Sequence, residues 1–239
     1  MQLSIAQRIN GFPWKRIEES LWKEGYAKIP WLLEREDTDA LIGLYHQPTH
    51  FRKSVNMERH RFGVGDYQYF TEPLPPLVKQ IRTETYSHLI NIGRAWQKAL
   101  GRPQHSIPET LPQFLSLCAA HGQDRPTPLL LHYREIGYNC LHQDVYGPIA
   151  FPFQLVVGLG RPEIDYTGGE FILVDQRARQ QARAIMIVLE QGEGIIFSNQ
   201  TRPVRGKRGY VHAKVRHGTS TIHSGERYTL GIIFHNAES

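Results

Sequence analysis

The spacing of apolar residues changes near residue 128, from a helical period to short strand-like runs. Before this point, residues 14–25 and 35–46 have the charge pattern of helices, and residues 73–100 carry apolar side chains near helical spacing. A proline at the start and Gly101 at the end are the usual boundaries of a helix. We also expect a short strand over residues 26–30 and an ordered loop or hairpin over residues 61–70.

After residue 128, apolar runs alternate with glycine, proline and aspartate, which is typical of strands joined by turns. The predicted strands are Leu129–Tyr133, Phe151–Gly158, Glu170–Val174, Ala184–Leu189, Gly194–Phe197, Val211–Val215 and Tyr228–His235. This spacing favours an antiparallel barrel or sandwich, here a double-stranded β-helix or jelly roll. The predicted fold is therefore mainly β with a helical extension (α+β). Residues 1–127 would form the extension packed on the barrel, and residues 128–239 the core of one integrated catalytic domain.

The composition is that of a globular protein and excludes a disordered or membrane-spanning chain. Of the 239 residues, 40% are hydrophobic and 21% charged, and the net charge is +5. No apolar run is long enough to cross a bilayer, and residues 1–14 lack the apolar segment of a secretory signal. Cys118 and Cys140 form no framework pattern, so we expect two reduced, buried thiols in a cytoplasmic protein.

Three residues in the second half have the chemistry of a metal site. His142 and Asp144 are two positions apart, so on a strand their side chains would project to the same face. Together with a distant histidine they would supply two imidazoles and one carboxylate, the facial triad of non-haem Fe(II) oxygenases. Such a triad leaves the opposite face of the ion open to a cosubstrate and O₂.

The third ligand must be chosen among His212, His217, His223 and His235. His217 is followed ten residues later by Arg227, whose planar guanidinium suits a carboxylate. At the same offset His212 and His223 meet isoleucines, so we predict His217 as the ligand and keep His223 as the alternative. A hydrolytic zinc site could use the same ligands, but it would not account for Arg227.

These motifs resemble the Fe(II)/2-oxoglutarate-dependent dioxygenase superfamily over residues 129–235. His217-Gly218-x-Ser220 and Ser224-Gly225-x-Arg227 are similar to the closing motif of its prolyl-hydroxylase-like branch. Leu141-His142-Gln143-Asp144, with Tyr133 nine residues before the histidine, is similar to the AlkB nucleic-acid demethylases. The resemblance implies that Fe(II), 2-oxoglutarate and O₂ are used. It also implies that Arg227 clamps the distal carboxylate of 2-oxoglutarate, assisted by Tyr133 and Thr229.

The segment before His217 is strongly basic. Residues 201–216 contain six cations and no acid, including Arg205, Lys207 and Arg208. In a jelly roll we expect this segment near the mouth of the active site, where it would contact a phosphate backbone. A solvated loop balanced by acids elsewhere is the alternative. Tyr67 and Tyr69 could form a base-stacking lid, or could pack the helical layer onto the barrel.

The substrate is the least constrained part of the prediction. Arg-Phe-Gly-x-Gly-x-Tyr-x-Tyr-Phe at residues 61–70, followed by Pro-Leu-Pro, resembles a bacterial family grouped with oxygenases proposed to act on damaged DNA. The leading hypothesis is therefore oxidative demethylation of an alkylated nucleic-acid base. Hydroxylation of a protein or amino-acid side chain is the second hypothesis. A non-catalytic, basic nucleic-acid-binding barrel is the third.

Overall fold

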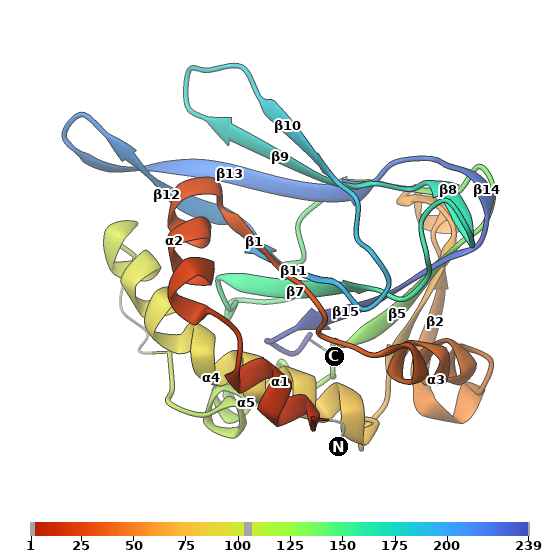
Figure 1. The fold of residues 1–239 in the computed structure, drawn as a ribbon. Helices are drawn as coiled ribbons and strands as arrows, with labels where there is room; N and C mark the ends of the chain where they lie inside the picture. Colours follow the sequence, from red (N-terminus) through yellow and green to blue (C-terminus); the bar gives the residue numbers. More distant parts are fainter. Residues whose placement is uncertain (1–2, 103–106, 239) are drawn as a thin grey trace.

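Two antiparallel sheets face one another and form the centre of the protein, as a computed structural model that describes residues 3–102 and 107–238 shows (Figure 1). The larger sheet has the strand order β1 (Tyr26–Ile29), β11 (Gly194–Ser198), β7 (Phe153–Gly158), β15 (Arg227–Ile233), β5 (Leu129–Tyr133), β4 (Asp66–Phe70) and β2 (Phe51–Asn56). The smaller sheet has the order β10 (Arg183–Ile187), β9 (Phe171–Arg177), β13 (Gly209–Thr219), β6 (Tyr138–His142) and β3 (Gly63–Val64), and β12 (Thr201–Gly206) also pairs with β13. A two-stranded ribbon, β8 (Tyr166–Gly168) and β14 (Ile222–Gly225), joins them. The predicted jelly roll is confirmed.

The helices pack mainly on the outer face of the larger sheet. They are α1 (Ile5–Asn10), α2 (Trp14–Glu24), α3 (Arg35–Tyr45), α4 (Pro76–Ala99) and α5 (Leu111–Ala120), with short 3₁₀ turns at Pro48–His50 and Glu58–His60. In Figure 1, α1, α4 and α5 lie below the larger sheet, whereas β9, β10 and β13 lie above it. No helix among the described residues is long and apolar enough to cross a membrane.

Local sequence signals explain where the helices begin and end. Ser4 and Thr110 form capping boxes with the glutamines three residues later, and these satisfy free N–H groups at the starts of α1 and α5. Gly25 ends α2 in the left-handed conformation (φ 84°), which glycine adopts without steric cost. α4 begins with a proline at its first turn and buries one face, including Trp96.

The N-terminal third is part of the sheet as well as its cover. β1 pairs with β11 at one edge, and β4 pairs with β5 and β2 at the other. The expectation of an ordered loop or hairpin over residues 61–70 is wrong, because β3 joins the smaller sheet and β4 the larger one. Gly63 and Gly65, both with positive φ, allow this crossing; a Cβ at Gly63 would lie 2.2 Å from the carbonyl oxygen of Tyr138.

Two apolar layers hold the fold together. One lies between the larger sheet and the helices, and there the Trp96 ring packs 4.5 Å from Phe153 between centroids. The other lies between the sheets and contains Phe171, Leu173, Phe197 and Val215 among its members. The space between the sheets that this second layer leaves unfilled is the candidate site.

Replacing Trp96 with alanine tests the helical layer. Because the ring is fully buried, we expect a loss of about 4 kcal/mol in the free energy of unfolding, and a fall of about 10 °C in Tm. Trp31→Ala is the matched control, since that ring is 77% exposed, and it should leave Tm nearly unchanged. Equal shifts in thermal unfolding would contradict the packing described for α4.

Candidate metal centre and its cavity

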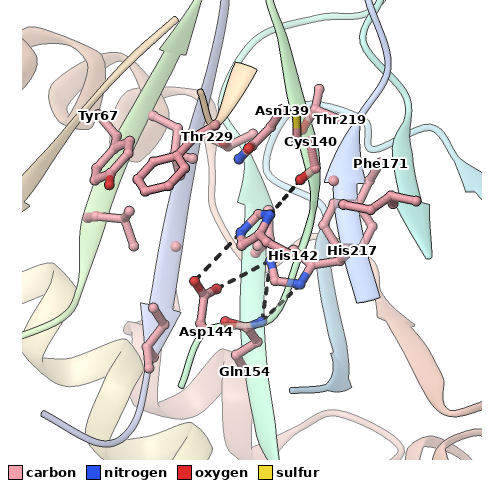
Figure 2. Close-up of a pocket in the computed structure, with 18 of the residues that line it drawn as sticks. Tyr67, Asn139, Cys140, His142, Asp144, Gln154, Phe171, His217, Thr219 and Thr229 are labelled. Atoms are coloured by element: carbon pink, nitrogen blue, oxygen red, sulfur yellow. Dashed lines mark hydrogen bonds and ion pairs between the residues drawn. The ribbon is translucent and has the colours of Figure 1, made fainter. Parts of the chain in front are cut away.

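The predicted triad comes together between the two sheets. His142 ends β6 and lies opposite His217 of β13 in the strand register, and Asp144 follows directly after β6. The Asp144 carboxylate lies 3.3 Å from His217 Nε2 and 3.6 Å from His142 Nε2. One ligand atom from each residue lies within 4.8 Å of the others (Figure 2). Two imidazoles and one carboxylate at this spacing fit a single ion bound on one face.

The other three histidines lie elsewhere. His212 is five residues from His217 on β13, so its side chain points to the opposite, exposed face. His223 is exposed on β14. His235 is buried, and its Nδ1 accepts a hydrogen bond from the backbone of Phe151. Among the described residues, only His142, Asp144 and His217 form a cluster that could hold a metal.

The electrostatics keep Asp144 and His217 in their metal-binding forms near neutral pH. Burial raises the pKa of Asp144, but His142, His217 and the Tyr146 hydroxyl outweigh it and hold this pKa well below its ordinary value. Burial, followed by the charge of His142, lowers the pKa of His217. Asp144 is therefore a carboxylate and His217 a neutral imidazole, which are the states that bind a divalent cation.

A second layer of polar contacts fixes the triad, and sequence reasoning missed it. His142 Nδ1 donates to the Cys140 carbonyl at 2.7 Å, which leaves Nε2 facing Asp144. The Tyr146 hydroxyl donates to Asp144 Oδ1 at 2.6 Å. The Asn199 side chain donates to the Asp144 backbone carbonyl at 2.8 Å. Contacts of this kind orient metal ligands, but only the tertiary fold brings Asn199 there.

Arg227 lies in the same cavity and brings a buried positive charge. Its side chain is only 2% exposed, its Nε has no hydrogen-bond partner, and no carboxylate of residues 3–102 or 107–238 forms an ion pair with it. The guanidinium carbon lies 5.8 Å from the ring centroids of both Tyr133 and Tyr166. A Cβ at Gly169 would lie 2.8 Å from Arg227 Cδ, so the Gly168-Gly169 turn gives this side chain its space. A buried cation without a paired anion is costly, and an anion that binds beside it would lower this cost.

The cavity has a volume of about 390 Å³, and the triad is part of its lining. Arg227, Tyr133 and Thr229 line it, as the resemblance implied, and so do Asn139 and Thr219, which sequence reasoning missed. Tyr67 and Tyr69 also line it, together with Tyr146, and their own rings meet edge to face with centroids 5.3 Å apart. Tyr67 and Thr229 are labelled beside the triad in Figure 2.

Two predictions about the residues around the metal triad are wrong. Arg205, Lys207 and Arg208 do not line the cavity, because β12 and β13 form a long hairpin whose turn lies far along β13 from His217. Cys118 is buried as expected, but Cys140 is exposed and lines the cavity.

Solved structures share this fold. A prolyl-4-hydroxylase from Pseudomonas putida aligns with a TM-score of 0.54 and 12% identity, covering 95% of this chain and 100% of that one. An oxidoreductase of the 2OG-Fe(II) oxygenase family from Burkholderia pseudomallei aligns with a TM-score of 0.53 and 14% identity, covering 96% and 95%. The non-haem α-ketoglutarate-dependent epimerase SnoN from nogalamycin biosynthesis aligns with a TM-score of 0.54 and 12% identity, covering 91% and 80%.

Sequence comparisons are more specific. Two uncharacterised proteins, from two strains of Mycobacterium tuberculosis, are each 47% identical over 168 residues, which is 70% of this chain and 72% of each relative. The profile of the Oxygenase-NA family, described as an oxygenase catalysing oxidative methylation of damaged DNA, matches residues 65–237. The protein therefore belongs to the Oxygenase-NA family and has the jelly-roll fold and metal-binding triad of the Fe(II)/2-oxoglutarate-dependent oxygenases.

Proposed function

We propose that the chain oxidises alkylated bases of DNA, using Fe(II) at the triad and 2-oxoglutarate as cosubstrate. The observation that carries the cosubstrate assignment is Arg227, a buried guanidinium with no carboxylate partner among the described residues, facing the cavity of the triad. A dicarboxylate would supply the missing anion, and a planar fork binds a carboxylate through two parallel hydrogen bonds. The family description, which names damaged DNA, supports the substrate class.

The triad, when loaded with iron, would activate O₂ and couple the conversion of 2-oxoglutarate into succinate and CO₂ to oxidation of a substrate C–H bond. His142, Asp144 and His217 hold the ion from one side. Arg227 binds the distal carboxylate of the cosubstrate, and the hydroxyls of Tyr133 and Thr229 donate hydrogen bonds to it. A methyl group on a base nitrogen would become hydroxymethyl, which is released as formaldehyde and leaves the unmodified base.

The tyrosine-lined wall receives the substrate. Tyr67, Tyr69 and Tyr146 surround the outer part of the cavity, and burial raises the pKa of Tyr69 well above its ordinary value, so its hydroxyl stays protonated. Neutral aromatic side chains of this kind can stack on a base that has left the helix. Leu129, Leu131 and Ile233 complete the wall and exclude water from the reacting carbon.

Succinate formation tests the proposal as a whole. With Fe(II), ascorbate and 2-oxoglutarate, we expect turnover that methylated single-stranded DNA stimulates and that Asp144→Ala lacks. Turnover that peptides stimulate and DNA does not would replace the DNA substrate with a side-chain hydroxylation. If the protein turned over no more 2-oxoglutarate than Asp144→Ala, a non-catalytic DNA-binding barrel would be the better description.

A pair of histidine variants tests the metal ligands. His217→Ala should weaken Mn(II) binding, measured without O₂, by at least about 100-fold, because one of three protein ligands is lost. His223→Ala should leave the affinity unchanged, because that side chain is exposed on β14 and lies outside the triad. The reverse order of effects would show that the third ligand has been misassigned.

Arg227→Lys tests the carboxylate clamp while keeping the positive charge. An ammonium cannot form the two parallel hydrogen bonds of a guanidinium, so the KM for 2-oxoglutarate should rise by about 10- to 100-fold. Arg134→Lys is the matched control, because that side chain is 71% exposed and should leave the KM unchanged. A normal KM in a folded Arg227→Lys protein, with Tm as the check, would remove Arg227 from the cosubstrate site.

A further inference from the structure

Two long hairpins project from the smaller sheet, and a groove lies between them. One hairpin joins β9 to β10, the other joins β12 to β13, and both extend beyond the layered part of the protein in Figure 1. The groove has a volume of about 600 Å³. Arg177 and Gln180 line it from the first hairpin, and Arg205, Lys207 and His212 line it from the second. None of these residues lines the cavity of the metal triad.

The two hairpins carry almost only positive charge. Residues 171–187 contain three arginines, and residues 201–219 contain six lysines and arginines. Asp175 is the one acid in these two segments, and it accepts a hydrogen bond from Arg202 Nε at 3.1 Å. Within the described chain, Arg177, Arg205 and Lys207 have no carboxylate in ion-pair distance, so their charges are free to meet an external anion.

A row of exposed basic residues continues from the groove along β13. His212, Lys214 and Arg216 are exposed, whereas Ala213, Val215 and His217 alternate with them and are buried. The row thus lies on the exposed, outer face of the sheet. The strand length from Gly209 to His217 is about 26 Å, at about 3.3 Å per residue. His212, at the near end of the groove, lies five residues or about 17 Å from His217, so the groove is still too far from the triad to bind the nucleotide that reacts there.

We propose that this groove and the row along β13 bind the sugar-phosphate backbone of DNA that flanks the target base. The proposal rests on the proposed function and adds a second contact surface to it. A line of basic residues with about 7 Å between neighbours on one strand face fits a polyanion whose charges also lie in a line. The near end of the groove, about 17 Å from His217, corresponds to about five base steps of DNA, so a DNA of about three nucleotides does not reach both surfaces.

The test compares two triple variants that each lose three exposed cations. Arg177→Ala/Arg205→Ala/Lys207→Ala removes the charges of the groove. Lys15→Ala/Lys79→Ala/Lys98→Ala is the matched control, because those lysines are exposed on α2 and α4 and none of them lines the groove. Fluorescence anisotropy measures the affinity for fluorescein-labelled, singly methylated DNA of about 24 and about three nucleotides, over a range of salt concentrations.

We expect the groove variant to bind the longer DNA at least about tenfold more weakly than the wild type, and the short DNA equally well. Its plot of log K against log salt concentration should become shallower by about two to three, whereas the control variant should match the wild type. Equal losses in both variants, or an equal loss on short and long DNA, would overturn the proposal. RNA of about 24 nucleotides is measured in the same way, and tighter binding of this RNA than of the DNA of equal length would overturn the choice of DNA.

The same proteins separate this proposal from the proposed function. Both triple variants should convert 2-oxoglutarate into succinate at the wild-type rate without DNA, because none of their residues lines the cavity. If the groove variant loses affinity for long DNA while no protein makes succinate, the docking surface stands and the catalytic assignment fails. If succinate forms but the groove variant binds long DNA normally, the catalytic assignment stands and the docking surface fails.

Discussion

The register between β6 and β13 is the constraint on which the metal centre depends. It places His217 directly opposite His142, and a shift in the ladder follows between His217 and Thr219. Because side chains alternate between the faces of a strand, a slip of one residue would turn His217 to the outer face, where Arg216 now lies. The apolar layer between the sheets opposes such a slip, since it would also expose Val215. Packing and metal binding therefore select the same register.

The cavity contains two charges of opposite sign, Asp144 and Arg227, which do not form an ion pair with each other. Asp144 is held by histidines and a tyrosine at one position, and Arg227 is held between two aromatic rings at another. An isolated buried charge is costly, and the cost falls when an opposite charge arrives. A divalent cation at the triad and a dicarboxylate at Arg227 would neutralise both. The fold thus tolerates an electrostatic imbalance that its ligands remove, so occupancy of the site should also make the protein more stable.

The sequence predicted those parts of the site that depend on short spacing along strands. His142 and Asp144 share a short segment, and Arg227 follows ten residues after His217, with only the short strand β14 between β13 and β15. The helices at residues 14–24, 35–45 and 76–99 were also predictable, because amphipathic spacing and terminal glycines or prolines are local. The Tyr146 and Asn199 contacts were not, since they depend on loop paths that no local pattern encodes. The basic segment was misplaced because charge composition says nothing about how far a hairpin extends.

The one-sided helical cover has a consequence for how this enzyme can change over generations. The hairpins at β9–β10 and β12–β13 carry exposed side chains near their turns, so substitutions there usually change stability by less than about 0.5 kcal/mol. The triad and Arg227, by contrast, are enclosed by both sheets, and few replacements keep their geometry. Mutations can therefore change the exposed surface of the hairpins while the residues of the metal centre stay the same. Members of one lineage could share a reaction and diverge in the macromolecules on which they perform it.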